Sequence, residues 1–475
     1  MQAFINSNHD YIIMIRKFVD RSSELNFLED SYKKGGLQVI IIYGRRRVGK
    51  TELIKHFIEG KDNIYFLADQ RGTEKNLERF THAIQTRFSL PPLKAESFEA
   101  VFKIIADRAP QMVMVIDEFS YLIEEDPALA SVFQLIIDEV LKETDAFLVL
   151  CGSSISMMEK GVLSYKSPLY GRRTGQIKLK PIEFRDLREF FPDYSIDQLI
   201  EAYAVLGGVP AYLNLFDPRR DFFENIQSTF FVREHLFYQE PEIILREELR
   251  EPRVYLNLLE AMARGKTRLT DIANAAGIDA KDASSYVRRL IELDLVGREY
   301  PITEKKPKSK RTRYYIKDNF FTFWFRFVLG NRELIERGQS ELLLDEVKKD
   351  FSRYVSWIFE RVCMDFLWAM QPFPIDKIGR WWYKGEEIDL VALNDRAKEI
   401  LFAECKWQAK EVDERIVENL KEKSKLVDWN RGKRREHFVV FSRSGFTESC
   451  LDHCKEKGVE TFDLRDMERI FNLKR

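Results

Sequence analysis

The sequence lacks an apolar stretch that could cross a membrane, and it contains few cysteines. No window of 18 uncharged apolar residues occurs in its 475 residues, so we expect no membrane-spanning helix and no membrane partner. Its N-terminus lacks the order of basic, apolar and small residues that marks a secretory signal. The five cysteines are scattered and odd in number, which favours a reducing compartment over a disulfide scaffold. These absences predict a cytoplasmic protein.

Patterns that bind metal through cysteine, or that recognise guanine, are also missing. Cys450 and Cys454 flank His453 at a spacing that suits half a metal site, but no second ligand pair exists. We therefore interpret both as structural or surface cysteines. No N-K-x-D string for guanine is present. The net charge of −1 hides local asymmetry, so it does not exclude a nucleic-acid partner.

One stretch joins a short apolar strand to a glycine-containing loop and a helix, in the pattern G-x-x-x-x-G-K-T. Gly44 and Gly49 let the backbone turn its N–H groups toward phosphate oxygens, and the N-terminus of the following helix adds positive charge. The Lys50 ammonium can reach the β- and γ-phosphates, and the Thr51 hydroxyl can bind Mg²⁺. The residues predicted to bind a nucleoside triphosphate are Gly44, Arg45, Arg46, Arg47, Val48, Gly49, Lys50 and Thr51.

Short apolar strands alternate with helical patterns over the first 154 residues of the chain. Because each strand is apolar on both faces, the pattern predicts an α/β fold with a parallel sheet that is covered on both sides. The predicted strands are residues 39–42, 63–68, 111–118 and 146–154, with helices at 74–90 and 128–143.

Two acids end the third predicted strand, where a P-loop protein carries its Walker B pair. We expect Asp117 to orient Mg²⁺ and Glu118 to activate the attacking water as a general base. Ser153 or Ser154, at the end of the next strand, is a candidate sensor of the γ-phosphate. Arg172 could stabilise charge on the leaving phosphate, or lie in a solvated basic loop. The sequence does not decide whether Arg172 acts within its own chain or on a neighbouring copy in a homo-oligomer.

Several strings resemble the archaeal-type ATPase family, a branch of P-loop ATPases related to the AAA+ and STAND groups. They are Asp20-Arg21-x-x-Glu24-Leu25, Tyr43 to Thr51, Ile116 to Phe119, Cys151 to Ser154, Pro168 to Arg172 and Leu206 to Pro210. The resemblance covers about residues 15 to 240. It implies ATP as the nucleotide, an ATPase core over residues 15–180 and a helical lid over residues 181–245.

Residues 251–318 carry three helical patterns followed by two short strands, and this order resembles a winged helix-turn-helix. Arg288 and Arg289 on the third helix could enter the major groove of DNA. The loop between the strands is basic and could follow DNA phosphates, although winged helices also bind proteins. The loop residues predicted to contact DNA are Lys305, Lys306, Lys308, Lys310 and Arg311. We expect connecting helices over residues 319–345, whose aromatic side chains form a core.

The last part of the chain, residues 346–475, carries a second chemical pattern. Glu404 and Lys406 lie two apart in a predicted strand and so face the same side, and pairing with the preceding strand would add Asp389. Two carboxylates and an ammonium suit Mg²⁺-assisted cleavage of a phosphodiester. The pattern resembles the PD-(D/E)xK, or restriction-endonuclease-like, superfamily, with Glu360 as its helical metal ligand. An active nuclease, an inactive DNA-binding fold and an accidental match all stay open.

Taken together, the sequence predicts an ATP-hydrolysing protein that acts on DNA, with ATP and Mg²⁺ as cofactors and a nuclease-like C-terminal domain. The main alternative is an ATP-switched, DNA-binding regulator whose C-terminal domain is inactive. A third alternative is protein remodelling without nucleic acid.

Overall fold

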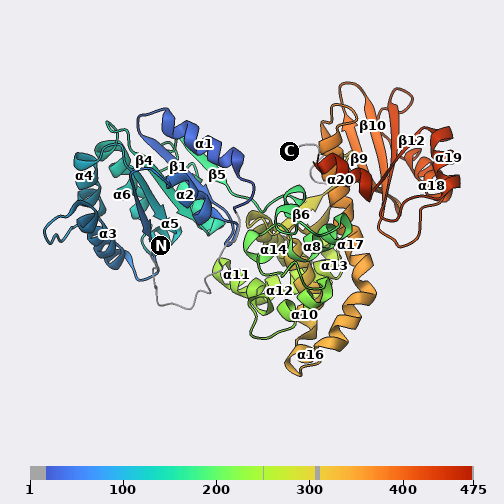
Figure 1. Ribbon diagram of the computed structural model, residues 1–475, viewed down its shortest axis with the longest axis horizontal. Helices are drawn as coiled ribbons and strands as arrows, with labels where there is room; N and C mark the ends of the chain where they lie inside the picture. The colour runs from blue at the N-terminus through green and yellow to red at the C-terminus, as the bar shows by residue number, and fades with distance from the viewer. Residues whose placement is uncertain (1–17, 250, 305–310, 473–475) are drawn as a thin grey trace. The chain divides into compact units, whose positions relative to one another are not determined.

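The computed structural model describes residues 18–249, 251–304 and 311–472, which form two compact units (Figure 1). The first unit contains the described residues up to Ile182 together with Val209–Asn214. The second contains Glu183–Gly208 and the described residues from Leu215 onward. Within these ranges, no helix is long and apolar enough to cross a membrane. The finer division into five domains stays a prediction.

A five-stranded parallel sheet forms the centre of the first unit, with the strand order β2-β3-β4-β1-β5. The α/β prediction is therefore confirmed, and four of the strands lie where the sequence places them. The fifth was not predicted because it is short, polar at alternate positions and at the sheet edge. The strands are β1 (Gln38–Tyr43), β2 (Asn63–Leu67), β3 (Val113–Asp117), β4 (Phe147–Gly152) and β5 (Gly175–Lys178).

Helices cover both faces of this sheet because consecutive residues of its central strands, which point to opposite faces, are apolar and buried. Ile40 and Ile42 pack with Phe57 on one face, whereas Val39 and Ile41 belong to the core on the other face. Helices α1 and α2 cover the first face, and α3, α4 and α6 cover the second (Figure 1). The helices are α1 (Ser22–Lys33), α2 (Lys50–Ile58), α3 (Thr73–Phe88), α4 (Phe98–Arg108), α5 (Phe119–Glu125), α6 (Leu129–Leu135), η1 (Ile136–Val140), α7 (Ile155–Met158), η2 (Glu159–Leu163) and α9 (Pro210–Leu213).

Helices and an aromatic core begin the second unit. Phe320, Phe323 and Trp324 are fully buried, and the first two pack against Phe230, so this aromatic run is core, as predicted. The Trp324 indole N–H also donates a hydrogen bond to the Tyr238 carbonyl at 3.1 Å. The elements here are η3 (Phe184–Glu189), α8 (Ile196–Leu206), α10 (Phe222–Phe230), η4 (Leu236–Tyr238), α11 (Glu240–Glu248), α15 (Asn319–Phe323), η5 (Trp324–Val328), η6 (Leu329–Asn331), α16 (Arg332–Glu336) and α17 (Ser340–Met370).

Three helices and a two-stranded antiparallel sheet lie between α11 and α15. They are α12 (Pro252–Ala263), α13 (Leu269–Ala276), α14 (Ala280–Glu292), β6 (Val296–Glu299) and β7 (Arg313–Ile316). All five elements occur where the sequence predicts them. Their interpretation as a winged helix stays a prediction.

A second five-stranded sheet follows α17, with the order β12-β11-β10-β9-β8. Strands β8, β9 and β10 are antiparallel neighbours, whereas β10, β11 and β12 run parallel. The elements are β8 (Lys377–Tyr383), β9 (Glu386–Asn394), β10 (Glu399–Lys406), α18 (Glu414–Ser424), β11 (Arg435–Ser442), α19 (Glu448–Lys457), β12 (Val459–Asp463) and α20 (Leu464–Asn472). The predicted pairing of β9 with β10 is present.

The aromatic core gives a direct test of how the second unit is stabilised. Replacement of Trp324 by Phe removes buried volume and the shorter of two hydrogen bonds to the Tyr238 carbonyl, which then keeps only the Arg332 guanidinium at 3.4 Å. We expect Trp324→Phe to lower the free energy of unfolding by about 1–3 kcal/mol in chemical denaturation. Trp368→Phe is the matched control, since Trp368 is 40% exposed and should change stability by less than about 0.5 kcal/mol. Equal losses in both variants would contradict this account.

Candidate functional site

The loop between β1 and α2 has a backbone that only glycine accepts at two points. Gly44 has φ +154°, and a Cβ there would lie 2.4 Å from the Leu179 carbonyl oxygen. Gly49, immediately before α2, has φ +97°. Both conformations are strained for any residue with a side chain. The loop therefore curls tightly at the carboxyl end of a central strand, as the P-loop prediction requires.

Lys50 and Thr51 begin α2 directly behind this loop. Lys50 is 6% exposed, and its ammonium donates hydrogen bonds to the Gly44 and Arg45 carbonyls, each at 3.0 Å. The Thr51 hydroxyl donates to a carboxylate oxygen of Asp117 at 3.0 Å. The structure thus joins the loop to the acid at the end of β3. The Arg46 guanidinium donates to the Tyr121 hydroxyl at 2.6 Å.

Asp117 is almost completely buried and accepts three hydrogen bonds. Its Oδ2 accepts from the hydroxyls of Thr51 and Tyr65, and the Tyr65 bond is 2.5 Å long. Its Oδ1 accepts from the Glu118 amide at 2.9 Å. Burial, and next to it the charge of Asp117, raises the pKa of Tyr65 well above its ordinary value, so this hydroxyl stays protonated. Sequence reasoning missed Tyr65, although its place on β2 beside β3 is a usable indication.

The neighbouring acid, Glu118, is held by the end of β4. Its Oε2 accepts hydrogen bonds from the Ser153 amide at 3.1 Å and from the Ser153 hydroxyl at 2.7 Å. The backbone of Glu118 lies in the left-handed region, with φ 54°. A non-glycine residue in this region is uncommon and occurs often at functional sites. The predicted pair, Glu118 and Ser153, is therefore in direct contact.

Two further arginines of the first unit, Arg172 and Arg21, have different hydrogen-bond partners. The Arg172 guanidinium forms an ion pair with Asp138 at 3.0 Å and donates to the Pro168 carbonyl. The predicted role of Arg172 at the leaving phosphate stays a prediction. Arg21, to which the sequence assigned no role, is 5% exposed and donates to the carbonyls of Val48 at 3.2 Å and Lys180 at 2.6 Å. Arg21 therefore connects Val48 in the P-loop to Lys180, which follows β5.

The second unit brings Asp389, Glu404 and Lys406 together, and we call this group the acid–lysine cluster. The Lys406 ammonium lies 2.5 Å from Glu404 Oε2 and 3.6 Å from Asp389 Oδ2. The Cys405 amide donates to Asp389 at 2.8 Å. Lys423 on α18, which sequence reasoning did not identify, lies 2.8 Å from the other oxygen of Glu404. Glu404 therefore has two cationic partners.

Burial and ion pairing set the protonation of this cluster. Burial, and after it the charge of Glu404, raises the pKa of Asp389 to about 6. Burial alone would raise the pKa of Glu404, but Lys406 and Lys423 hold it below its ordinary value. Burial by itself would lower the pKa of Lys406, but the charges of Asp389 and Glu404 raise it above its ordinary value. Lys406 is therefore a cation near neutral pH, which suits it to position water rather than to accept a proton.

Glu360 lies on α17 and pairs with an arginine. Its Oε2 lies 3.4 Å from Arg380 on β8, and Arg380 also contacts Glu387 and approaches Glu299 at 3.9 Å. In the described part of the chain, no group of three or more His, Cys, Asp or Glu side chains is arranged to hold a metal ion. Asp389 and Glu404 supply two carboxylates. That number fits Mg²⁺ where water and substrate phosphates provide the other ligands.

The residues predicted to contact DNA are only partly described. Arg288 is exposed on α14, and Arg289 pairs with Glu292 at 3.1 Å. Arg311 pairs with Glu304, and its carbonyl accepts a hydrogen bond from the Trp382 indole at 3.2 Å. The loop residues outside the described ranges are Lys305, Lys306, Lys308 and Lys310. DNA contact through these residues stays a prediction.

Comparison with protein families gives two matches. A model described as an ATPase domain predominantly from Archaea matches residues 18–216. A second model, described as archaea bacterial proteins of unknown function, matches residues 324–418. The first match contains the P-loop, Asp117, Glu118 and Ser153. The second contains Glu360 and the acid–lysine cluster.

Individual proteins match over most of the chain. The "Uncharacterized protein MJECL04" of Methanocaldococcus jannaschii is 40% identical over 417 residues, which cover 86% of this chain and 92% of that protein. The Walker-type ATPase PABY2304 of Pyrococcus abyssi has a similar fold, with a TM-score of 0.50 and 22% identity, over 65% of this chain and 96% of that chain. The Aeropyrum pernix ORC2 protein, in ADPNP-ADP complexes, gives a TM-score of 0.43 and 14% identity, over 70% of this chain and 98% of that chain.

The backbone of the P-loop predicts the effect of one added methyl group. In Gly44→Ala, the new Cβ meets the Leu179 carbonyl, which belongs to the backbone and has little room to move. We expect roughly tenfold or greater loss of affinity for a fluorescent ATP analogue. Gly171→Ala is the control, because a Cβ at Gly171 meets nothing within 4 Å. Unchanged affinity in Gly44→Ala would show that the loop does not form the binding site.

The raised pKa of Glu360 should make the stability of the second unit depend on pH. Burial, with the charge of Asp389 adding to it against the opposing effect of Arg380, raises the pKa of Glu360 to about 8 from an ordinary value of 4.5. Between these values the folded state keeps a proton that the unfolded chain has released. The free energy of unfolding should therefore fall as pH rises from about 5 to 8, by a few kcal/mol at most.

Glu360→Gln should flatten this dependence in urea titrations at several pH values. Glu346→Gln, at an exposed position on the same helix, should leave the dependence as it is in the wild type. An identical pH dependence in the wild type and Glu360→Gln would contradict the assignment.

Proposed function

The chain belongs to a family of archaeal ATPases, and we propose that it binds ATP with Mg²⁺ at the P-loop and hydrolyses the γ-phosphate. One observation carries this proposal. Hydrogen bonds of 2.7 to 3.1 Å link Thr51, Asp117, Glu118 and Ser153 where α2, β3 and β4 meet. Lys50 precedes Thr51 at the start of α2 and donates to the carbonyls of Gly44 and Arg45 in the P-loop. These are the residue types that phosphoryl transfer to water needs.

The residues present fit a nucleotide with Mg²⁺. Gly44 has no side chain that would block a phosphate from approaching the backbone of the loop. The buried Lys50 ammonium donates a hydrogen bond to the carbonyl of the same glycine. Thr51 and Asp117 would hold Mg²⁺, which supplies positive charge to the phosphate oxygens when it is bound. In place of its present carbonyl partners, Lys50 would donate to phosphate oxygens.

Glu118 has the role of general base in this proposal. Its carboxylate takes a proton from the attacking water, and the two donors of Ser153 fix one carboxylate oxygen while this happens. Ser153 lies at the end of β4 and contacts Glu118 directly. Loss of the γ-phosphate could therefore shift the Glu118 carboxylate through the side chain of Ser153 alone. Ser153 is thus proposed as a positioning residue for Glu118.

Removal of the Lys50 cation should abolish turnover. We expect Lys50→Ala to reduce the rate of phosphate release by at least about 100-fold, since the ammonium offsets charge that develops in the transition state. Lys55→Ala is the matched control on the same helix, where Lys55 is exposed and pairs with Glu52. Turnover that persists in a folded Lys50→Ala protein would refute the P-loop assignment.

We further propose that the protein acts on DNA through the second unit. The order α12, α13, α14, β6, β7 supports a winged helix. The antiparallel strands β8 to β10, with Asp389 and Glu404 beside Lys406, support a nuclease-like domain that cleaves a phosphodiester with Mg²⁺. In this reading, Asp389 and Glu404 hold the metal and Lys406 positions water.

One observation favours the alternative of an ATP-switched, DNA-binding regulator. Glu404 is neutralised by both Lys406 and Lys423, and Glu360 is held by Arg380. Cationic partners on these acids reduce their affinity for a metal ion. In that case the second unit binds DNA without cutting it, and ATP hydrolysis in the first unit acts as a switch.

A cleavage assay separates the two candidates. Purified protein is incubated with supercoiled, linear, single-stranded and branched DNA, with Mg²⁺ or Mn²⁺, in the presence and absence of ATP. If the cluster is catalytic, Asp389→Ala and Lys406→Ala should each lower cleavage at least about 100-fold, because metal binding and water positioning are lost. Asp395→Ala, at an exposed acid beyond the end of β9, should cut normally. Cleavage that survives in both cluster variants would place the activity elsewhere, and no cleavage at all would favour the regulator.

A further inference from the structure

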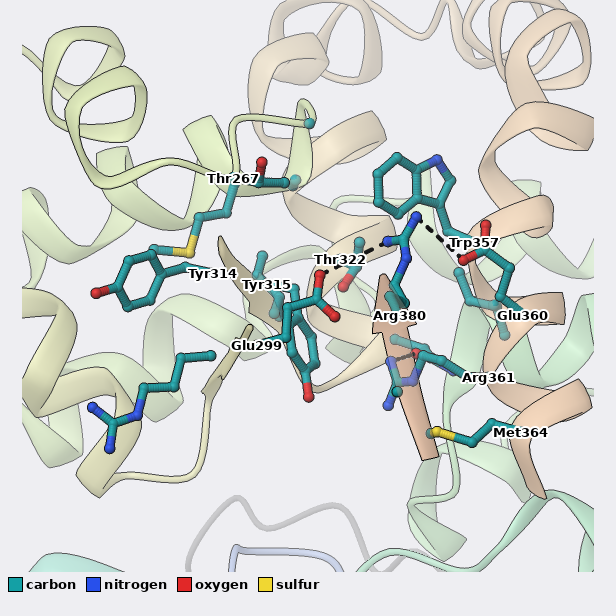
Figure 2. Close-up of a pocket in the computed structure, with 18 of the residues that line it drawn as sticks. Thr267, Glu299, Tyr314, Tyr315, Thr322, Trp357, Glu360, Arg361, Met364 and Arg380 are labelled. Atoms are coloured by element: carbon teal, nitrogen blue, oxygen red, sulfur yellow. Dashed lines mark hydrogen bonds and ion pairs between the residues drawn. The ribbon is translucent and has the colours of Figure 1, made fainter. Parts of the chain in front are cut away.

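A cavity of about 640 Å³ lies within the second unit. One wall comes from the end of α12 and from β6 and β7, and the other comes from α17 and β8 (Figure 2). Its volume is in the range of sites that hold a small organic ligand. Glu360 lines this cavity, but Asp389, Glu404, Lys406 and the residues of the P-loop do not.

The charges that line the cavity are mainly positive, since six arginines and two glutamates contribute to its walls. Four of the arginines have acidic partners. Arg264 pairs with Glu260, Arg326 and Arg353 pair with Asp350, and Arg380 lies between Glu299 and Glu360 (Figure 2). The other two have no ion pair within the described chain and lie on opposite walls. They are Arg298 on β6 and Arg361 on α17.

The environments of these two arginines differ. Arg361 donates hydrogen bonds to the Asn319 side-chain oxygen at 2.9 Å and to the Lys317 carbonyl at 3.0 Å, so its position is fixed, and the charge of Asp365 lies near it without forming an ion pair. Arg298 lies near the Tyr300 ring, at 5.9 Å from its centre. The Tyr300 hydroxyl is buried and has no hydrogen-bond partner in the described chain. A buried polar atom of this kind is costly unless a ligand or water satisfies it.

Aromatic and apolar side chains supply the rest of the lining. Tyr314 and Tyr315 come from β7, and Trp357 comes from α17 (Figure 2). Trp357 is 46% exposed, which is high for an indole beside a cavity. Met364 and Leu390 add apolar surface. Such walls favour a ligand with a flat, largely apolar body.

We propose that this cavity binds a nucleotide, either free or at the end of a nucleic-acid strand, with its phosphate at Arg298 and Tyr300 and its base against the aromatic walls. A phosphate monoester offers close to two negative charges and three acceptor oxygens, which suits a guanidinium beside an unpartnered hydroxyl. The base offers a flat ring for the tyrosines and Trp357. The proposal goes beyond ATP turnover and does not depend on it, because the cavity shares no residue with the P-loop.

The test measures binding of nucleoside monophosphates by equilibrium dialysis in the Lys50→Ala protein. AMP and GMP lack the β-phosphate that the P-loop lysine reaches, so the first unit should contribute little to their binding. The probes are AMP, GMP, a thymidine trinucleotide with a 5′-phosphate, adenosine and inorganic phosphate. We expect a monophosphate or the trinucleotide to bind at least roughly tenfold more tightly than adenosine or phosphate.

Substitutions in the cavity then locate the binding. In the Lys50→Ala background, Arg298→Gln and Tyr300→Phe should weaken it, Arg298→Gln by roughly tenfold or more. Arg219→Gln, at an 85% exposed position in the same unit, should leave it unchanged. Binding of a monophosphate identifies a free nucleotide as the source, whereas binding of the trinucleotide alone identifies a strand end. Failure of every probe to bind, or equal binding in Arg298→Gln that melts at the wild-type temperature, would overturn the proposal.

Discussion

The buried carboxylate of Asp117 ties the start of α2, directly after the P-loop, to the centre of the parallel sheet. It accepts hydrogen bonds from Thr51 on α2, Tyr65 on β2 and the amide of Glu118. A carboxylate that is 1% exposed is very unfavourable without such donors. The need to satisfy it therefore fixes three neighbouring segments in one arrangement. This arrangement in turn sets the unusual backbone of Glu118 and brings its side chain to Ser153.

The sequence predicted the first unit well because its pattern is local. Apolar strands that alternate with helices specify a parallel sheet, and the glycines at 44 and 49 mark a loop whose backbone turns sharply. The contacts of Tyr65 and Arg21 were not predicted. Arg21 reaches the Lys180 carbonyl across 159 positions of sequence, and spacing in a single sequence does not reveal such a contact. Strand β5 was missed because edge strands need little apolar surface.

In the second unit, prediction succeeded where strand periodicity was sufficient. The two-residue spacing of Glu404 and Lys406 placed both side chains at Asp389, as the structure has them. The partners that set the charge of the acids, Lys423 and Arg380, come from other elements and were not foreseen. The cavity was not predicted for the same reason, since its walls come from separate segments between Met262 and Leu390.

The central claim, that Glu118 is the base for ATP hydrolysis at this loop, is tested most directly with Glu118→Gln. Radiolabelled ATP is incubated with this protein, and the bound nucleotide is then recovered and identified. The account predicts that ATP binds with an affinity within about threefold of the wild type and is recovered as ATP, with turnover at least roughly 100-fold slower. Recovery of ADP at the wild-type rate would contradict the account and place the base at another residue.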